Sequence, residues 1–263
     1  MSIASAVSSQ PEPPALSAER LSISFGSLAA VRNVDLALPV GARHALIGPN
    51  GAGKSTLVGL MTGALKSHTG RVLLRGDDVT ALGMPLRVKR GLARTFQVTS
   101  LFPEMTALEA TSLAICERDG FTARWLRSLA SYRAQTDEAA EILRELGVLT
   151  IANIPMGELA YGHQRVMEIA LALAARPRVL LLDEPAAGIP AGESGKLFEV
   201  LERLPADLAL LFIEHDMHLV RRFARHVTVL AAGAVLSEGS PIDVASDPRV
   251  QEAYLGKRER KRR

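Results

Sequence analysis

The sequence predicts an α/β fold with a parallel core sheet, an N-terminal antiparallel β subdomain and an inserted α-helical subdomain. Three observations support this prediction. Strand and helix patterns alternate after about residue 165, which is typical of a parallel sheet. Several short strand patterns, separated by glycine and charged turns, lie between residues 21 and 74. Residues 105–147, between these two regions, are helical in pattern.

The composition is that of a globular chain. With 263 residues, 48% of them hydrophobic, it can bury the core of one large domain or two small ones. Its single cysteine, Cys116, excludes an internal disulfide and suits a reducing compartment. No apolar run approaches the roughly 18 residues that span a bilayer. The longest runs, "VLLLD" and "LALLFIEHD", end in acidic residues, as buried parallel strands do.

Both ends of the chain are expected to be flexible. Residues 1–17 are rich in proline and serine and lack the basic start and apolar stretch of a secretory signal. Residues 257–263, "KRERKRR", hold six of the 31 basic and one of the 28 acidic residues, so the rest has 25 and 27. This near-neutral body argues against a nucleic-acid surface. We expect a solvated basic tail, with contact to anionic lipids as the first alternative and to nucleic acid as the second.

The N-terminal half is expected to contain strands followed by helices. Four strands read "RLSISFG", "NVDLALPVG", "RHALIG" and "GRVLLRG", and a helix begins near Gly53. The segment "TDEAAEILRELGV" reads as a helix with acidic residues in its first turn and Gly147 just past its end. Its apolar positions fall on one face: Ala139, Ile142, Leu143 and Leu146.

The C-terminal half shows the alternation most clearly. A helix begins at "YGHQR" and ends before Pro177, with an apolar face made of Val166, Ile169, Ala170 and Leu173. It is followed by the strand "RVLLLD", a helix over about 195–204, the strand "LALLFIEHD", a helix over about 217–223 and a hairpin in "HVTVLAAGAVLSEG". Residues from about 100 to 165 are therefore expected to form a helical insertion into an α/β core.

The segment "GPNGAGKS" matches the pattern G-x-x-x-x-G-K-[ST] and lies between a strand and a helix, as this pattern requires. Its glycines let successive backbone N–H groups converge on phosphate oxygens. Lys54 can reach the β- and γ-phosphates, and the Ser55 hydroxyl can bind Mg²⁺. A P-loop NTPase core is therefore predicted. Its phosphate loop is made of Gly48, Pro49, Asn50, Gly51, Ala52, Gly53, Lys54, Ser55 and Thr56.

Two later strands end in polar residues. In "VLLLDEP", Asp183 can supply a carboxylate to Mg²⁺, and Glu184 can polarise an attacking water. In "LLFIEHD", His215 falls at the carboxyl edge of the sheet, where ligands bind in such folds. The segment "ELAYGHQR" adds a glycine at a helix entrance, whose free N–H groups and positive dipole end form a second anion site.

With these residues together, the chain resembles the ATP-binding subunit of ABC transporters over about residues 18–256. The resemblance implies that Phe25 stacks on adenine and that Gln97 of "RTFQ" contacts Mg²⁺ and senses the membrane domain. It makes Asp183 a metal ligand, Glu184 the catalytic base and His215 the switch histidine. Residues 159–163, "LAYGH", are then the signature segment, which closes over ATP held by a second subunit. Its nucleotide-binding residues are Ala160, Tyr161 and Gly162.

The phrases "ARTFQ", "LAYGHQR", "LLDEPAAG", "IEHDMHLV" and "AYLG" are similar to those of branched-chain amino-acid importers. This implies ATP hydrolysis with Mg²⁺ at the cytoplasmic face of the inner membrane. The implied partners are membrane permease subunits, a second ABC ATPase subunit in a homo- or heterodimer and, indirectly, a periplasmic solute-binding protein, with no nucleic acid. Two alternatives stay open: uptake of urea or short amides, and a non-transport ABC ATPase of translation or DNA repair. The non-transport types normally carry two cassettes, a long coiled coil or zinc cysteines, which this sequence lacks.

Two segments differ from the usual family pattern. In the signature segment, Ala160 replaces serine and His163 replaces glutamine. The lost serine hydroxyl removes one possible contact to the γ-phosphate and leaves the backbone and Gly162. After Glu184, Pro190 stands where aspartate or asparagine is usual. These differences leave open whether that loop makes its contact across the dimer and whether both composite ATP sites are active.

Overall fold

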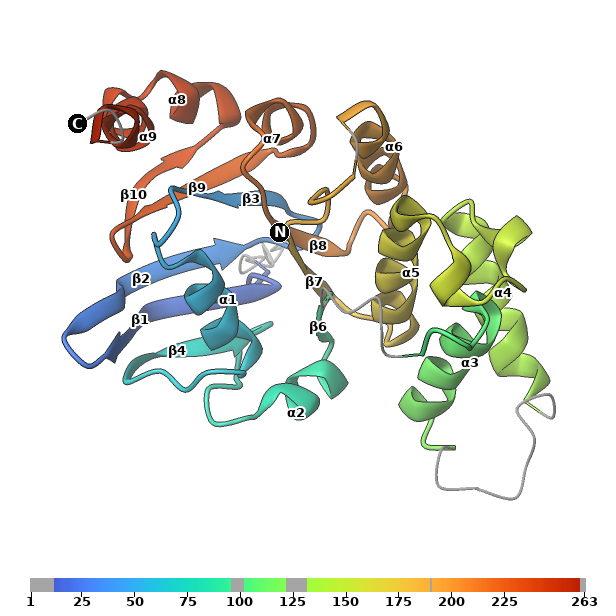
Figure 1. The fold of residues 1–263 in the computed structure, drawn as a ribbon. Coiled ribbons are helices and arrows are strands. Elements are labelled where there is room, and N and C mark those ends of the chain that lie inside the picture. Colours follow the sequence, from blue (N-terminus) through green and yellow to red (C-terminus); the bar gives the residue numbers. More distant parts are fainter. Residues whose placement is uncertain (1–11, 96–101, 122–131, 190, 261–263) are drawn as a thin grey trace, which may run out of the picture.

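Two β-sheets occupy one side of the molecule, and a group of helices projects from the other side (Figure 1). The computed structural model describes residues 12–95, 102–121, 132–189 and 191–260. No helix in these ranges is both long and apolar enough to cross a bilayer. The arrangement confirms the predicted α/β core with helices inserted into it.

The smaller sheet is antiparallel, with the order β2-β1-β4-β5. Its strands are β1 (Leu16–Phe25), β2 (Leu28–Leu38), β4 (Thr69–Leu74) and β5 (Asp77–Asp78). Burial alternates along β1, where Leu21 is fully buried while its neighbours Arg20 and Ser22 are more exposed. Such alternation reflects the side-chain period of two and confirms the predicted antiparallel β subdomain.

The first strand begins inside the segment 1–17 that we expected to be a flexible leader. Ala15 and Leu16 are 2% and 0% exposed, and Leu16 pairs with both Leu38 and Leu74. Burying one leucine side chain contributes about 1.5–3 kcal/mol, which favours extending the strand to this residue. The leader is therefore shorter than predicted, and residues 1–11 lie outside the described part of the chain.

The larger sheet has the order β10-β9-β3-β8-β7-β6. Its strands are β3 (Arg43–Ile47), β6 (Leu92–Arg94), β7 (Val179–Asp183), β8 (Ala209–Ile213), β9 (His226–Ala231) and β10 (Ala234–Gly239). All pairs are parallel except the β9–β10 hairpin, which the sequence predicted. Because β8 lies between β3 and β7, the carboxyl ends of these three strands are neighbours.

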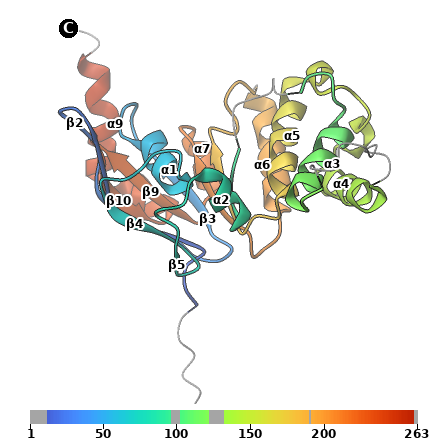
Figure 2. The ribbon, with the colours of Figure 1, turned by 90° about the horizontal axis from the view of Figure 1, so that it is seen from below.

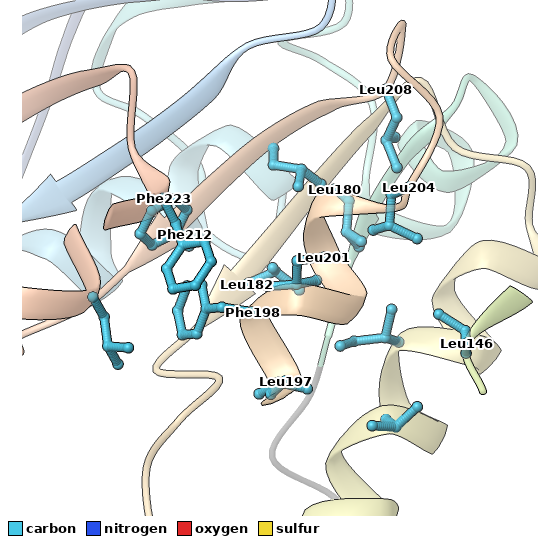
Figure 3. Close-up of a cluster of buried hydrophobic side chains, with 14 of the residues drawn as sticks. Leu146, Leu180, Leu182, Leu197, Phe198, Leu201, Leu204, Leu208, Phe212 and Phe223 are labelled. Carbon is cyan, nitrogen blue, oxygen red and sulfur yellow. The ribbon is translucent and has the colours of Figure 1, made fainter. Parts of the chain in front are cut away.

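Helix α6 (Ala191–Glu202) packs on β7 and β8 through a cluster of buried apolar side chains (Figure 3). Phe198 stacks on Phe223 of α7 (Met217–Phe223), with 4.6 Å between the ring centroids. It meets Phe212 of β8 edge to face at 5.6 Å. Leu180 and Leu182 of β7 belong to the same cluster. This packing holds β7 and β8 against α6, and it thereby positions the polar residues that follow the two strands.

The inserted helices lie together at the end of the molecule opposite β2 and β4 (Figure 2). They are α3 (Ala107–Arg118), α4 (Arg133–Glu145) and α5 (Tyr161–Ala174), with short 3₁₀-helices at Leu149–Ile151 and Met156–Glu158. Thr106 and Glu109 form a capping box at the start of α3. Arg118 and Glu138 join α3 to α4 through an ion pair of 2.6 Å. The predicted buried face of α4 is confirmed by Ala139 and Leu143, both 0% exposed.

The structure contains several elements that the sequence did not predict. Helix α1 (Lys54–Thr62) was expected, but α2 (Met84–Lys89), the edge strand β6 and α8 (Pro241–Ser246) were not. Helix α9 (Pro248–Arg260) continues into residues 257–260, which we expected to be a flexible tail. Lysine, arginine and glutamate are good helix formers, so a helix already begun at Pro248 continues through them.

Candidate active site

The phosphate loop connects β3 to α1 and is shaped by close backbone contacts. Gly48 and Gly53 have φ angles of 150° and 102°. A Cβ atom on them would lie 2.1 Å from the Leu230 carbonyl oxygen and 2.3 Å from the Ala30 carbonyl oxygen, respectively. Only glycine fits these two positions, because any Cβ there overlaps an oxygen atom. Gly51 (φ 78°) has nothing within 4 Å of its Cβ position, so its role is conformational alone.

Helix α1 directs its N-terminus at this loop. Gly53 is its N-cap, and no side-chain hydrogen bond caps it in the described structure. The Lys54 ammonium donates hydrogen bonds to the carbonyl oxygens of Gly48 (2.8 Å) and Pro49 (3.3 Å), so it lies over the loop. Ser55 is exposed beside it. Backbone N–H groups, an ammonium and a hydroxyl are thus gathered within one turn, a set that fits phosphate and Mg²⁺.

The C-terminal helix reaches the same loop. Tyr254 of α9 lies close enough to the backbone N–H of Gly48 for this group to influence its hydroxyl. Burial raises the pKa of Tyr254, and the Gly48 N–H opposes this rise. In the sequence, this tyrosine belongs to the segment "AYLG", which contributes to the resemblance to branched-chain amino-acid importers. The structure gives it a contact with the first residue of the phosphate loop.

The end of β7 carries the two predicted carboxylates in different settings. Asp183 Oδ2 lies 2.7 Å from Arg94 Nη2 of β6, and the two side chains are 16% and 20% exposed. Glu184 begins a turn over residues 184–189, which we call the catalytic turn. Its φ is +48°, a conformation that is uncommon for a residue other than glycine. The Glu184 N–H donates to the Ile213 carbonyl (3.1 Å), and the Ala187 N–H donates to the Glu184 carbonyl (3.0 Å).

The end of β8 contains a buried acid that the sequence analysis did not single out. Glu214 is 1% exposed and accepts hydrogen bonds from the N–H groups of Ala186 and His215, each at 3.2 Å. Burial raises the pKa of Glu214, and these bonds oppose the rise. The His215 side chain is 75% exposed, with Nδ1 3.9 Å from Glu214 Oε2. The sequence signal that could have identified Glu214 is its place at the end of the apolar run in "LLFIEHD".

The signature segment lies against the catalytic turn of its own chain. Ala160 is the N-cap of α5 and makes no side-chain cap bond in the described structure. The Tyr161 hydroxyl hydrogen-bonds the Ala187 carbonyl oxygen at 3.0 Å and also contacts the Arg165 guanidinium. The Tyr161 ring packs beside Gly188, where a Cβ atom would lie 2.9 Å from the ring. Residues 161 and 187, far apart in sequence, are thus in direct contact.

Comparison with known proteins places the chain in a family. Residues 31–187 match the ABC transporter family, and residues 234–260 match the branched-chain amino acid ATP-binding cassette transporter family. The chain belongs to the ATP-binding cassettes of ABC transporters. Within them it belongs to the branched-chain amino-acid group, and it is an ABC ATPase.

The similarity covers nearly the whole cassette. This chain is 37% identical over 252 residues to the high-affinity branched-chain amino acid transport ATP-binding protein BraF of Pseudomonas aeruginosa. The alignment covers 92% of this chain and 98% of that protein. The chain is 39% identical over 250 residues to LivG of Escherichia coli, with the same coverage. Among solved structures, an ABC transporter cassette in its ADP conformation superposes with a TM-score of 0.82 at 32% identity, covering 92% of this chain and 99% of that one.

Phe25 and Gln97 were expected at the nucleotide site, and Pro190 was noted as a difference from the family pattern. Phe25 is 51% exposed at the end of β1, next to the hairpin whose Ala30 touches Gly53. Gln97 and Pro190 lie outside the described residues. Among the residues that are described, no group of three or more His, Cys, Asp or Glu side chains could hold a metal ion by itself.

Proposed function

We propose that this cassette binds ATP at its phosphate loop and hydrolyses it with Glu184 as the base and His215 as the switch histidine. The observation that carries the proposal is topological. The phosphate loop, Glu184 and His215 follow β3, β7 and β8, which are adjacent strands of one parallel sheet. Ligands bind at the carboxyl ends of strands in open α/β sheets. Lys54 then faces the β- and γ-phosphates, and Phe25 stacks on adenine.

The residues present fit a Mg²⁺ ion, which binds few protein ligands and keeps phosphate and water oxygens around it. Ser55 and Asp183 would hold the ion, with Gln97 as a further ligand. When bound, Mg²⁺ neutralises charge on the β- and γ-phosphates. The protein's own part is to supply the Asp183 carboxylate, which is paired with Arg94 until the ion would replace this partner.

We propose that two cassettes, identical or different, clamp two ATP molecules between them. The signature segment, through Ala160, Tyr161 and Gly162, would close over ATP held by the partner's phosphate loop. It is suited to this because it begins α5 with exposed residues and with N–H groups that no side chain caps in the described structure. A bacterial cassette of the same fold has been solved as a dimer, with a TM-score of 0.71 at 23% identity.

We propose that the transporter imports branched-chain or related hydrophobic amino acids through separate permease subunits. The cassette would lie at the cytoplasmic face of the membrane, with a periplasmic binding protein delivering the solute. The names of the relatives BraF and LivG and the match over residues 234–260 support this solute class. Uptake of urea or short amides is the alternative, and the matches to transporter cassettes argue against a translation or DNA-repair ATPase.

For the domain organisation, we propose one cassette over residues 18–256 with a helical subdomain over about 100–165. Strand β1 extends the folded part to Leu16, and α9 extends it to Arg260. Residues 261–263 of the basic tail lie outside the described chain.

Two substitutions test the proposed chemistry. Lys54→Ala should abolish nucleotide binding, because it removes the cation facing the β- and γ-phosphates. Glu184→Gln should keep ATP binding and stop turnover, because only the charge that activates water is lost. Binding of a fluorescent ATP analogue and phosphate release measure the two effects. Normal hydrolysis by Glu184→Gln would remove the assignment of the base.

The transported solute needs a separate test. Copurification from membranes followed by mass spectrometry should identify two permease subunits and a second ATPase. In proteoliposomes containing that complex, binding protein loaded with leucine should stimulate ATP hydrolysis, and binding protein exposed to urea should not. Stimulation by urea or acetamide alone would favour the short-amide alternative.

A further inference from the structure

The catalytic turn is held from both sides by side chains to which the proposed chemistry gives no role at this turn. On one side, Glu214 of the β8 end accepts a hydrogen bond from the Ala186 N–H at 3.2 Å. On the other, Tyr161 at the start of α5 bonds the Ala187 carbonyl at 3.0 Å. These two anchors lie on consecutive residues, two and three positions after Glu184, in a turn whose first residue has a positive φ.

The direction of the Tyr161 hydrogen bond is fixed by its neighbour. Arg165 contacts the Tyr161 hydroxyl, and a guanidinium can only donate. The hydroxyl oxygen therefore accepts from Arg165, and its proton is left for the Ala187 carbonyl. Arg165 is 7% exposed and is held in turn by Glu168, at 2.8 Å. The tyrosine is thus oriented by a buried ion pair within α5.

Glu214 fixes the other side by the same logic. Its carboxylate can only accept, and its two oxygens receive the N–H groups of Ala186 and His215 separately. One buried side chain therefore connects the catalytic turn to the backbone of the switch histidine. A buried carboxylate used in this way is costly to remove, since both N–H groups lose their acceptor at once.

We propose that Tyr161 and Glu214 are positioning residues that set the catalytic turn and couple it to the signature segment. This inference rests on the proposed role of Glu184. In a dimer, the signature segment of one cassette faces the partner's ATP, whereas Glu184 acts on the cassette's own ATP. The Tyr161–Ala187 bond joins these two parts within one chain, so closure over one ATP moves the base of the other site. The two composite sites are thereby linked through a single hydroxyl.

Tyr161→Phe tests the proposal because it removes that hydroxyl and keeps the ring beside Gly188. We expect kcat to fall about fivefold, which corresponds to about 1 kcal/mol. The Kd of the full-length chain for a fluorescent ATP analogue should stay within twofold of wild type, and the Hill coefficient for ATP hydrolysis should fall toward 1. The matched control is Tyr132→Phe, since the buried Tyr132 hydroxyl has no hydrogen-bond partner in the described structure. It should leave kcat, Kd and the Hill coefficient unchanged.

Glu214→Gln provides the second arm. The amide keeps one oxygen acceptor but turns a donor toward the other N–H group, so kcat should again fall with Kd retained. The double variant should lose less than the product of the two single losses, because both substitutions release the same turn. The proposal would be overturned if Tyr161→Phe left kcat unchanged or weakened ATP binding as much as it lowered kcat. It would also be overturned if the double variant lost kcat by the full product of the two single losses. Normal turnover in Glu184→Gln would instead overturn the proposed function, so the two failures are distinguishable.

Discussion

We expect Arg94→Met to destabilise the cassette while strengthening its use of Mg²⁺. The Arg94–Asp183 pair is 2.7 Å long, and its side chains are 20% and 16% exposed. Removing the guanidinium leaves a mostly buried carboxylate without this donor, and a hydrogen bond to a charged group contributes about 1.5–3 kcal/mol. Methionine retains the apolar part of the side chain, so we expect a loss of about 2 kcal/mol. In a chain of this size, that lowers the melting temperature by about 4–8 °C.

The effect on Mg²⁺ has the opposite sign. Two unit charges 4 Å apart repel by about 1 kcal/mol even in water, and a divalent ion roughly doubles the repulsion. If Asp183 is a Mg²⁺ ligand, as proposed, loss of the neighbouring cation should lower the Mg²⁺ concentration for half-maximal hydrolysis by about thirtyfold, the factor that corresponds to about 2 kcal/mol. Stability in the absence of nucleotide and the Mg²⁺ concentration that hydrolysis requires should therefore both fall, so the variant is less stable but binds Mg²⁺ more tightly.

Thermal unfolding without nucleotide and Mg²⁺ titrations of ATPase activity measure the two effects. Arg144→Met is the matched control, because the Arg144 side chain is 55% exposed in its pair with Glu141. Such helix surface pairs contribute only about 0.3–0.5 kcal/mol. An unchanged melting temperature in Arg94→Met would show that the ion pair adds nothing to stability. A higher Mg²⁺ requirement would refute the electrostatic reasoning and make Arg94 a group that orients Asp183 for the metal.

Gly162→Asp should leave ATP binding by the isolated chain intact but abolish ATP-dependent dimerisation and hydrolysis, because its carboxylate would face the partner's γ-phosphate. Mixing it with Lys54→Ala should restore some hydrolysis, whereas loss of ATP binding by the monomer would contradict a role in trans. Burial and then the charge of His226 lower the pKa of His44 from 6.5 to about 3, so the folded state favours the neutral ring. The contribution of His44 to the free energy of unfolding should be complete above the pKa of an unfolded histidine. It should fall by about 2 kcal/mol by pH 5, because the unfolded chain then binds a proton that the folded chain does not. Urea unfolding near neutral pH and at pH 5 measures this loss, and an equal loss in His44→Gln would assign it to another group. Truncation after Gly256 should leave ATPase activity unchanged, and a large loss would show that the end of α9 packs on the catalytic body.

Local patterns predict the parts of this cassette whose geometry depends on nearby residues. The phosphate loop is an example, because the spacing of its glycines and Lys54 between a strand and a helix identifies it. The carbonyl oxygens that exclude a Cβ atom at Gly48 and Gly53 belong to Leu230 and Ala30, which are distant in sequence and were not predicted. The face of α4 is another, since Ala139 and Leu143 fall four residues apart and both are buried. The β9–β10 hairpin follows from two apolar runs around Gly233.

Contacts across the sheet could not be predicted in this way. Strand β6 has only three residues, Leu92–Arg94, too short for a recognisable period. Its pairing with β7 brings Arg94 to Asp183 across 89 positions of sequence. Glu214 and Tyr161 likewise meet the catalytic turn only because of strand order and helix packing. Single-sequence reasoning identifies which residues carry charge, but not which charges the fold brings together.

Three carboxylates at the same edge of the sheet show how the fold can separate their roles. Asp183 is balanced by Arg94, a partner that a divalent cation can replace, which suits a metal ligand. Glu184 is half-buried at the start of a turn with positive φ, where hydrogen bonds of its own N–H and carbonyl hold the main chain, which suits the proposed base. Glu214 is 1% exposed and receives backbone N–H groups, so its oxygens are committed to positioning. Environment, and not residue type, distinguishes the three carboxylates. Glu214→Gln and Glu184→Gln should therefore give different defects: the first should disturb the geometry of the catalytic turn, and the second should remove the proposed base.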